Sequence, residues 1–196
     1  ILVNTAKKND SSDADWTKNG AGHLVNHKYG FGSIDATAAV NASETWNRVA
    51  PEISTTSKTL NIQTEIPDNK AQGITSAFSI DKNIKLESVE LKFDAQHAFR
   101  GDLQVALTSP DGTKSILAEQ RNDAHDDYKK WTFSSVRHWG ESSLGDWTVN
   151  VADKAGNDVT GFWNSARLKL YGTKNTNTPN LKSINGTEEN NTLTGT

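Results

Sequence analysis

Short runs in which apolar and polar residues alternate recur along most of the chain, with turn residues between them. A period of two is typical of strands that turn one face toward a core. The runs lie at 59–66, 74–80, 85–93, 103–109, 114–119, 131–136, 147–153 and 166–172. About eight short strands at this spacing predict a mainly β fold, namely an antiparallel β-sandwich or jelly roll.

Residues 1–48 follow a different pattern and predict a small helical and loop segment. The stretch 19–32 is rich in Gly and Asn, which indicates turns. Residues 33–46 predict a helix, with Ser33 or Asp35 as its N-terminal cap. Because this segment has few large apolar side chains, we expect it to be less ordered than the strands unless it docks on the sandwich.

The last part of the chain, 174–196, is polar and begins with a Pro-containing stretch. Such a composition predicts a flexible linker. Three units are therefore expected, at 1–48, 51–173 and 174–196.

Composition excludes several classes of function. There are 21 basic and 24 acidic residues without a long basic run, so nucleic acid is not an expected partner. No stretch of eighteen apolar residues predicts a membrane span. The chain has no cysteine, so any staple must be of another kind, such as calcium held by carboxylates. The apolar start without Met leads us to expect a monomeric fragment of a larger protein.

The tryptophans allow two interpretations. Four of them, Trp131, Trp139, Trp147 and Trp163, lie in or beside the predicted strands. They could form a sugar-binding platform on a sandwich, but side chains of this size more often fill the core. We therefore expect them inside.

Three motifs near the beginning carry a resemblance to a known family. They are Trp16, the stretch Asn-Gly-Ala-Gly-His at 19–23, and His-Lys-Tyr-Gly-Phe-Gly-Ser-Ile-Asp-Ala at 27–36. With them, residues 1–48 resemble the C-terminal end of a subtilisin-like catalytic domain of the kexin/furin branch. His23 and His27 also have a spacing that could bind zinc on a helix, but the surrounding glycines favour loop histidines.

Residues 51–173 resemble the P domain that follows the protease in the same family. The matching motifs are Arg100-Gly101-Asp102-Leu103, Thr108-Ser109-Pro110-Asp111-Gly112-Thr113, Trp139-Gly140-Glu141, Gly145-Asp146-Trp147-Thr148 and Leu170-Tyr171-Gly172-Thr173. The resemblance implies a jelly roll, in agreement with the strand pattern. It also implies structural roles for Arg100, Gly101, Asp102, Trp139, Gly140 and Trp147.

The tripeptide Arg100-Gly101-Asp102 is also an adhesion sequence in some proteins. A receptor-binding copy needs an exposed flexible loop, whereas here strand alternation begins directly at Leu103. The resemblance too makes the tripeptide part of the fold. Asp102 would then need a cationic partner, backbone donors or a metal ion.

Calcium is the metal that carboxylates at the end of a sandwich would suit. The candidate ligands are Asp94, Asp102, Glu141 and Asp146, because each lies in or beside a motif of the resemblance. Hydrogen bonds from Arg100, Arg121 or backbone amides are the alternative for Asp102.

The family's catalytic motifs for Asp, His and Ser are absent, so we expect this chain to be inactive by itself. The resemblance implies a parent serine endopeptidase that cleaves after basic residues, with its own catalytic domain as the partner of this chain. The end of the chain is similar to the lead-in of haemolysin-type calcium repeats, which implies a secreted bacterial parent. A stand-alone carbohydrate- or cell-surface-binding module is the alternative.

Overall fold

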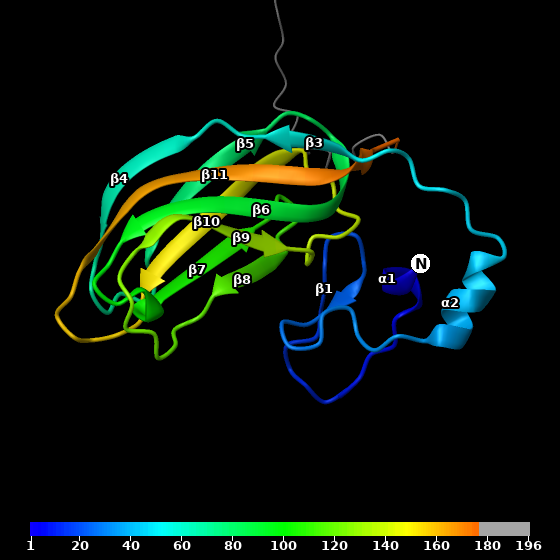
Figure 1. Cartoon of the computed structure of the whole chain (residues 1–196), viewed down its shortest axis with the longest axis horizontal. Helices are drawn as coiled ribbons and strands as arrows, with labels where there is room; N and C mark the ends of the chain where they lie inside the picture. The colour runs from blue at the N-terminus through cyan, green and yellow to red at the C-terminus, as the bar shows by residue number, and fades with distance from the viewer. Residues whose placement is uncertain (177–196) are drawn as a thin grey trace, which may run out of the picture.

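The computed structural model describes residues 1–176, which form a β-sandwich with a smaller N-terminal segment beside it (Figure 1). The N-terminal segment contains α1 Leu2–Thr5, β1 Thr17–Lys18, β2 Leu24–Val25 and α2 Ala36–Ser43. The sandwich contains β3 Ile53–Thr56, β4 Leu60–Ile66, β5 Ile74–Ile80, β6 Ile84–Gln96, η1 Arg100–Asp102, β7 Leu103–Thr108, β8 Lys114–Ala118, β9 Tyr128–Ser135, β10 Gly145–Asp153 and β11 Gly161–Lys174. Neither α-helix in the described part is long and apolar enough to cross a membrane.

The nine strands of the sandwich form two antiparallel sheets. One sheet has the order β5-β10-β7-β8, and the other has the order β3-β11-β6-β9, with β4 also pairing with β11. Strands that are neighbours in a sheet are often distant in sequence, as expected for a jelly roll. The predicted fold class is thus confirmed. The additional strand, β3, is only four residues long and lies in a stretch rich in Ser and Thr, which has a weak apolar signal.

Strands β6 and β11 form the longest pair of the molecule. Their register runs from Phe162 opposite Gln96 to Lys174 opposite Ile84, with two irregularities. Buried positions alternate along both strands, as in Leu91 and Phe93 on β6 and Leu168 and Leu170 on β11. This alternation is the reason that the two strands direct one face into the core.

Only some of the four tryptophans expected in the core are buried there. Trp147 and Trp163 are fully buried, and Trp163 packs against Phe93 with ring centroids 5.8 Å apart. Trp139 is half-buried, whereas Trp131 is 43% exposed. The prediction was wrong for Trp131 because it lies on the edge strand β9, where its ring packs against Tyr128 and Phe133 and under Arg100 at 5.4 Å but keeps one side in solvent.

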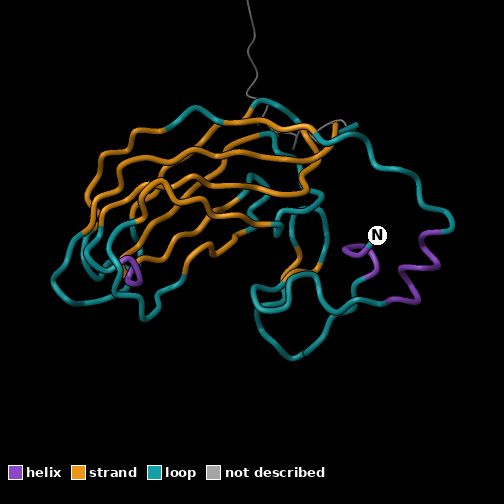
Figure 2. The backbone as a smooth tube through the Cα atoms, viewed as in Figure 1, coloured by secondary structure: helices purple, strands orange, loops and turns teal. Residues whose placement is uncertain are grey.

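The N-terminal segment consists mostly of loops (Figure 2). Its helix α2 is shorter than predicted, and Asp35 caps it by accepting a hydrogen bond from the Ala38 amide at 2.9 Å. No residue of α2 is buried. A helix that packs so little has no tertiary contacts to extend it, which explains why it ends at Ser43.

We predict that Trp163→Ala lowers the free energy of unfolding by about 3–5 kcal/mol, because it leaves a large cavity in the core. Trp131→Ala is the matched control, and it should cost clearly less, about 1–2 kcal/mol, because the ring is 43% exposed at the edge of the sheet. Urea unfolding followed by far-UV circular dichroism measures both. Equal losses of unfolding free energy in the two variants would contradict the conclusion that Trp163 is buried in the core and Trp131 is partly exposed.

Candidate functional site

Two groups of polar residues lie at opposite ends of strand β7 (Figure 1). The first surrounds the turn after β7 and binds the N-terminal segment. The second surrounds η1, directly before β7, and contains the Arg-Gly-Asp tripeptide. Both were partly visible in the sequence motifs, but their composition follows from the tertiary structure.

Asn19 is the centre of the contact between the N-terminal segment and the sandwich. It is buried, and its Nδ2 donates to the carbonyls of Arg137 at 3.0 Å and Trp139 at 2.9 Å. Its Oδ1 accepts from the amides of Ala21 and His23 in its own turn. One amide side chain therefore satisfies four backbone groups from two parts of the chain.

The neighbouring residue, Gly20, extends this contact to the turn after β7. Its amide donates to Thr113 Oγ1 at 2.9 Å and to Glu141 Oε1 at 2.7 Å, and the Thr113 hydroxyl also donates to Glu141 Oε1. A Cβ atom at Gly20 would lie 2.3 Å from the Cβ of Asp111. Glycine at this position leaves room for the Asp111 side chain beside the Gly20 backbone.

Glu141 is a buried carboxylate in this contact. Burial raises the pKa of the carboxyl, but His138 and the Thr113 hydroxyl lower it by more, so the pKa lies below its usual value of 4.5. His138 Nδ1 lies 3.4 Å from Oε2 of Glu141, close enough for attraction but longer than a normal hydrogen bond. The ionised carboxylate is therefore the form that the folded chain favours.

A second polar contact joins the N-terminal segment to strand β8. The amide of Ile116 on β8 donates to Nε2 of His27 at 3.0 Å, and Nδ1 of the same ring lies 2.9 Å from Asp15. Arg137 donates to the Thr17 hydroxyl at 2.9 Å. His27 thus has a structural role, which agrees with the expectation of a loop histidine.

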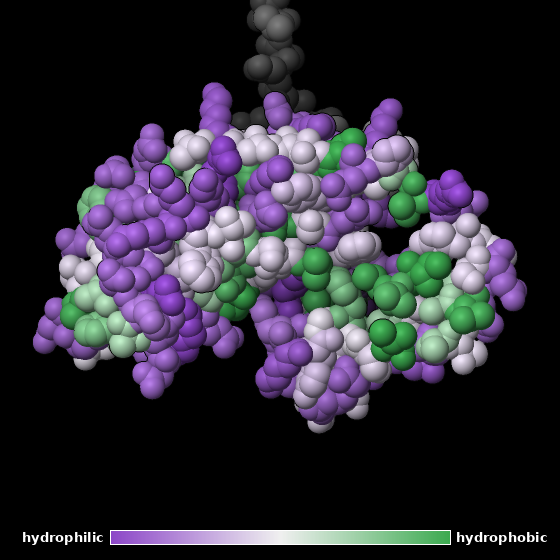
Figure 3. Space-filling model, viewed as in Figure 1, coloured by the Kyte–Doolittle hydropathy of each residue, from purple (hydrophilic) through white to green (hydrophobic). Residues whose placement is uncertain are grey.

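Apolar side chains remain exposed on the N-terminal segment. Figure 3 shows them on the side formed by α1 and α2. They include Leu2, Ile34, Val40 and Trp46, which are 57%, 71%, 63% and 39% exposed. A hollow of about 650 Å³ lies between this segment and Leu86 of the sandwich. Exposed apolar surfaces of this kind are often covered by another protein or by another domain of the same protein.

The Arg-Gly-Asp tripeptide forms a 3₁₀ turn held by the loop 121–125. The Gly101 amide donates to the carbonyl of Asp123, and the Arg121 amide donates to the carbonyl of Gly101. A Cβ at Gly101 would lie 2.4 Å from the carbonyl oxygen of Arg121. Because Gly101 is buried and bonded in this way, the geometry favours the structural interpretation of the tripeptide over a receptor-binding loop.

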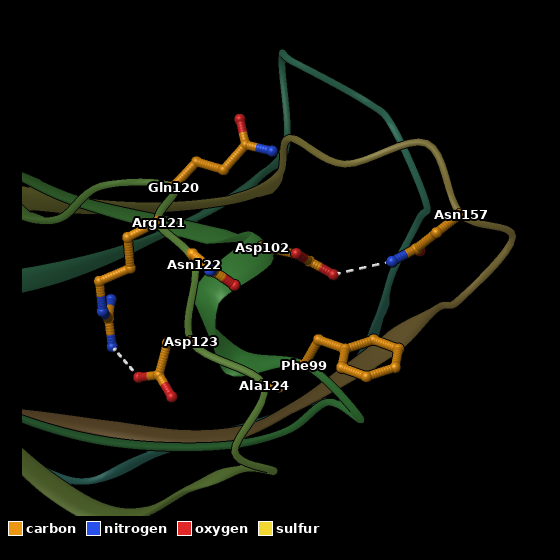
Figure 4. A pocket seen from close by; sticks show the side chains of 8 residues that line it. All are labelled: Phe99, Asp102, Gln120, Arg121, Asn122, Asp123, Ala124 and Asn157. Carbon is orange, nitrogen blue, oxygen red and sulfur yellow. Dashed lines mark hydrogen bonds and ion pairs between the residues drawn. The ribbon is translucent and has the colours of Figure 1, made fainter.

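Arg100 and Asp102 point to different partners. Arg100 Nε donates to Asp123 Oδ2 at 2.9 Å, and hydrogen bonds from Arg100 and His125 hold the pKa of the Asp123 carboxyl far below its usual range. Asp102 instead accepts from Asn157 Nδ2 at 3.0 Å across a surface hollow of about 550 Å³ (Figure 4). The alternative that paired Asp102 with Arg100 or Arg121 has no support in these contacts.

The four carboxylates named as calcium ligands do not meet at one place. Asp94 accepts from the Lys130 amide and from Asn164, Glu141 is buried at the N-terminal contact, and Asp146 is exposed on β10. Among the described residues, Asp102 alone of the four belongs to a group of three possible metal ligands, and its companions there are His97 and Asp153. The four carboxylates therefore do not form a single calcium site, because the motifs that contain them lie in different parts of the sandwich.

Sequence reasoning missed several residues of both sites. Asn19 lay within a named motif, but nothing indicated that it binds the sandwich. Asp153 carried one usable signal, since it ends the alternating run 147–153, whereas His97 lies beyond the run 85–93 and carried none. That signal does not tell which strand ends are neighbours, because pairing between distant strands is a tertiary property.

Comparison with known proteins identifies the sandwich. The family model described as "Proprotein convertase P-domain" matches residues 86–170. These residues are a proprotein convertase P domain. Their match covers β6 to most of β11, and so includes the Arg-Gly-Asp turn and the loop that carries Glu141.

Relatives of this P domain extend the match beyond the sandwich. Rat "Proprotein convertase subtilisin/kexin type 5" is 34% identical over 88% of this chain and 10% of its own length. The "Dibasic-processing endoprotease" of Schizosaccharomyces pombe is 31% identical over 88% of this chain and 26% of its own length. The chain thus spans about a tenth to a quarter of these relatives.

A solved structure supports the same fold. The serine protease of Aeromonas sobria, in a complex with a chaperone, superposes with a TM-score of 0.81 at 20% identity. The superposition covers 89% of this chain and 39% of the protease chain. At this identity the likeness concerns the fold of the P domain and its N-terminal segment.

We predict that Glu141→Gln destabilises the chain in a pH-dependent way. Because the folded pKa of Glu141 is below 4.5, its stabilisation is fully present above that pH and is lost as the pH falls through the folded value. At pH 7 the variant should lose about 1–3 kcal/mol of unfolding free energy, and this difference should shrink below pH 4.5. Urea unfolding from pH 7 to pH 3 measures it.

Glu44→Gln is the control for this measurement, because Glu44 is exposed at the end of α2. It should leave stability unchanged at every pH. A loss in Glu141→Gln that stays constant down to pH 3 would contradict the role of the ionised carboxylate.

Proposed function

We propose that this chain is the non-catalytic P domain of a kexin-like serine endopeptidase, together with the end of the catalytic domain that precedes it. Its role is to support the folding and stability of that catalytic domain and to modulate its activity. The observation that carries the proposal is the buried polar contact of Asn19 and Gly20 with Thr113, Glu141 and the Arg137–Trp139 backbone.

This contact supports the proposal because it joins two parts of different kinds. The N-terminal segment has hardly any core, with Val25 its only buried apolar side chain among those described, yet hydrogen bonds to backbone groups of Arg137, Trp139 and Ile116 hold it on the sandwich. The segment also exposes apolar side chains, such as Ile34 and Val40, that the contact with the sandwich leaves uncovered. A supporting module needs such an arrangement: one face bound to the P domain and another that continues into a catalytic domain.

The relatives also support it. Their printed names are those of convertases and a dibasic-processing endoprotease, and each is several times longer than this chain. We infer that the parent cleaves after basic residues, that it is secreted or acts in a secretory pathway, and that the separate chain is monomeric. The expected bacterial origin stays a prediction, since the sequence relatives named here come from a mammal and a yeast.

The test compares three proteins: this chain, the full gene product, and the full product with the P domain removed. The full product should hydrolyse a peptide substrate with a basic residue before the cut, and this chain should not. Removal of 51–173 should lower the yield of folded, active protease several-fold. Hydrolysis by the purified chain alone would overturn the proposal.

A point variant makes the same test without a deletion. In the full product, Asn19→Ala should lower the temperature of half-inactivation, because it leaves two buried carbonyls without their donor. Asn41→Ala, on the exposed face of α2, is the matched control and should have no effect. Equal inactivation of both variants would show that the contact does not support the enzyme.

Calcium binding stays a separate proposal, with Asp102 as the ligand to test. Thermal unfolding of the chain with calcium and with a chelator should show a higher midpoint with calcium, and Asp102→Asn should remove the difference. An identical midpoint in both conditions would contradict calcium binding and leave Asp102 as a hydrogen-bonded residue of the fold.

A further inference from the structure

Three side chains that offer metal ligands converge at the end of the sandwich where η1 lies. They are His97, directly after β6, Asp102 at the end of η1, and Asp153 at the end of β10. One ligand atom from each lies within 4.8 Å of the other two. We propose that they bind one divalent transition-metal ion, with Zn²⁺ as the first choice, and that this ion staples the three strand ends together.

The orientation of His97 is the first support. Its Nδ1 lies 2.8 Å from the Phe99 carbonyl oxygen, and its Nε2 lies 2.9 Å from Asp153 Oδ2. The Phe99 amide also donates a hydrogen bond to Nδ1, at 3.1 Å. These contacts are compatible with both tautomers of the ring, one with the proton on Nδ1 and one with the proton on Nε2. A metal-binding histidine takes the tautomer in which one nitrogen donates to such a carbonyl, so that the lone pair of the other nitrogen is directed to the ion.

Nε2 of His97 and Oδ2 of Asp153 lie 2.9 Å apart, so without an ion a proton lies between them. A metal ion bound by both groups would take the place of that proton. Both side chains are fully buried, so water cannot solvate the charge of Asp153. A metal ion bound by both groups would neutralise it.

The two carboxylates are also held in place by outer hydrogen bonds. Asp153 Oδ1 accepts from the Ala155 amide at 2.9 Å, and Asp102 Oδ2 accepts from Asn157 Nδ2 at 3.0 Å. The Lys154 amide donates to the Asp102 carbonyl, which ties the end of β10 to η1. In each carboxylate one oxygen is thus held by an outer partner and the other is available to an ion.

The backbone leaves space for the imidazole at this place. A Cβ at Gly161, the first residue of β11, would lie 2.6 Å from Cδ2 of His97. The glycine therefore permits β11 to start directly beside the ring. On the other side, Asp102 lines the hollow of about 550 Å³ in Figure 4, through which an ion and a water ligand could reach the group.

The choice of metal follows from the ligands. Calcium takes six to eight oxygen ligands, and an imidazole is a poor partner for it. One imidazole and two carboxylates match Zn²⁺, with water in the fourth tetrahedral position. A chain without cysteine cannot use disulfides as staples. An ion that joins the ends of β6, β7 and β10 would serve the same purpose.

The experiment uses the whole chain after treatment with a chelator and buffer exchange. Titration with ZnCl₂ followed by calorimetry should give one saturable site, and Co²⁺ should give the visible absorption bands of a tetrahedral nitrogen–oxygen site. Zinc at about 100 times its dissociation constant should raise the melting temperature by about 5–10 °C.

Two variants and one control locate the site. His97→Gln and Asp102→Asn should each abolish the cobalt bands and the rise in melting temperature. His125→Gln is the control, because His125 also lies against an aspartate, Asp123, but is exposed. It should bind like the original chain. If His97→Gln does not fold, the half-exposed Asp102→Asn decides the question alone.

Absence of saturable zinc binding would overturn the proposal and leave His97 and Asp153 as an internal hydrogen-bonded pair. Zinc binding of unchanged strength in Asp102→Asn would overturn it as well. A melting temperature that rises with calcium and not with zinc would favour the calcium proposal instead. None of these outcomes depends on the protease activity of a longer parent.

Discussion

The antiparallel pair of β6 and β11 is the constraint on which the rest of the structure depends. These two strands run the full length of the larger sheet, and β3, β4 and β9 pair with their outer edges. Both candidate sites lie at the ends of β6. At one end the Leu86 amide donates to the Glu141 carbonyl, and directly after the other end comes His97. A shift in this register would move both sites at once.

The contact between the N-terminal segment and the P domain is polar rather than apolar. Its buried groups form hydrogen bonds that depend on position, such as those from Asn19 to two carbonyls of one loop. Bonds of this kind add little net stability, but they strongly disfavour any other arrangement, because a displaced partner would leave buried groups unsatisfied. The contact therefore defines how the segment is oriented. One fixed orientation is what the proposed supporting role toward a catalytic domain would require.

The Arg-Gly-Asp turn shows how one tripeptide serves the fold in three ways. Gly101 allows the backbone of the loop 121–125 to approach, and Arg100 holds Asp123 of the same loop. Asp102 turns the other way, toward His97 and Asp153. The tripeptide thereby closes one end of the sandwich. With its glycine buried, it lacks the freedom that recognition by a receptor would need.

The sequence by itself determined the fold class and the positions of most strands, because alternation along a strand is a local pattern that survives without knowledge of partners. Its motifs also determined the family resemblance and the special role of Gly101, and they left Ser33 and Asp35 as alternative caps of α2, of which the structure uses Asp35. The tertiary structure alone decided that Trp131 lies on an edge strand and stays partly exposed, that Asn19 docks on the sandwich, and that Asp94, Asp102, Glu141 and Asp146 lie apart. It also decided that His97, Asp102 and Asp153 lie together. These features depend on which strand ends become neighbours, and in an antiparallel sandwich that is set by pairing between residues far apart in the chain.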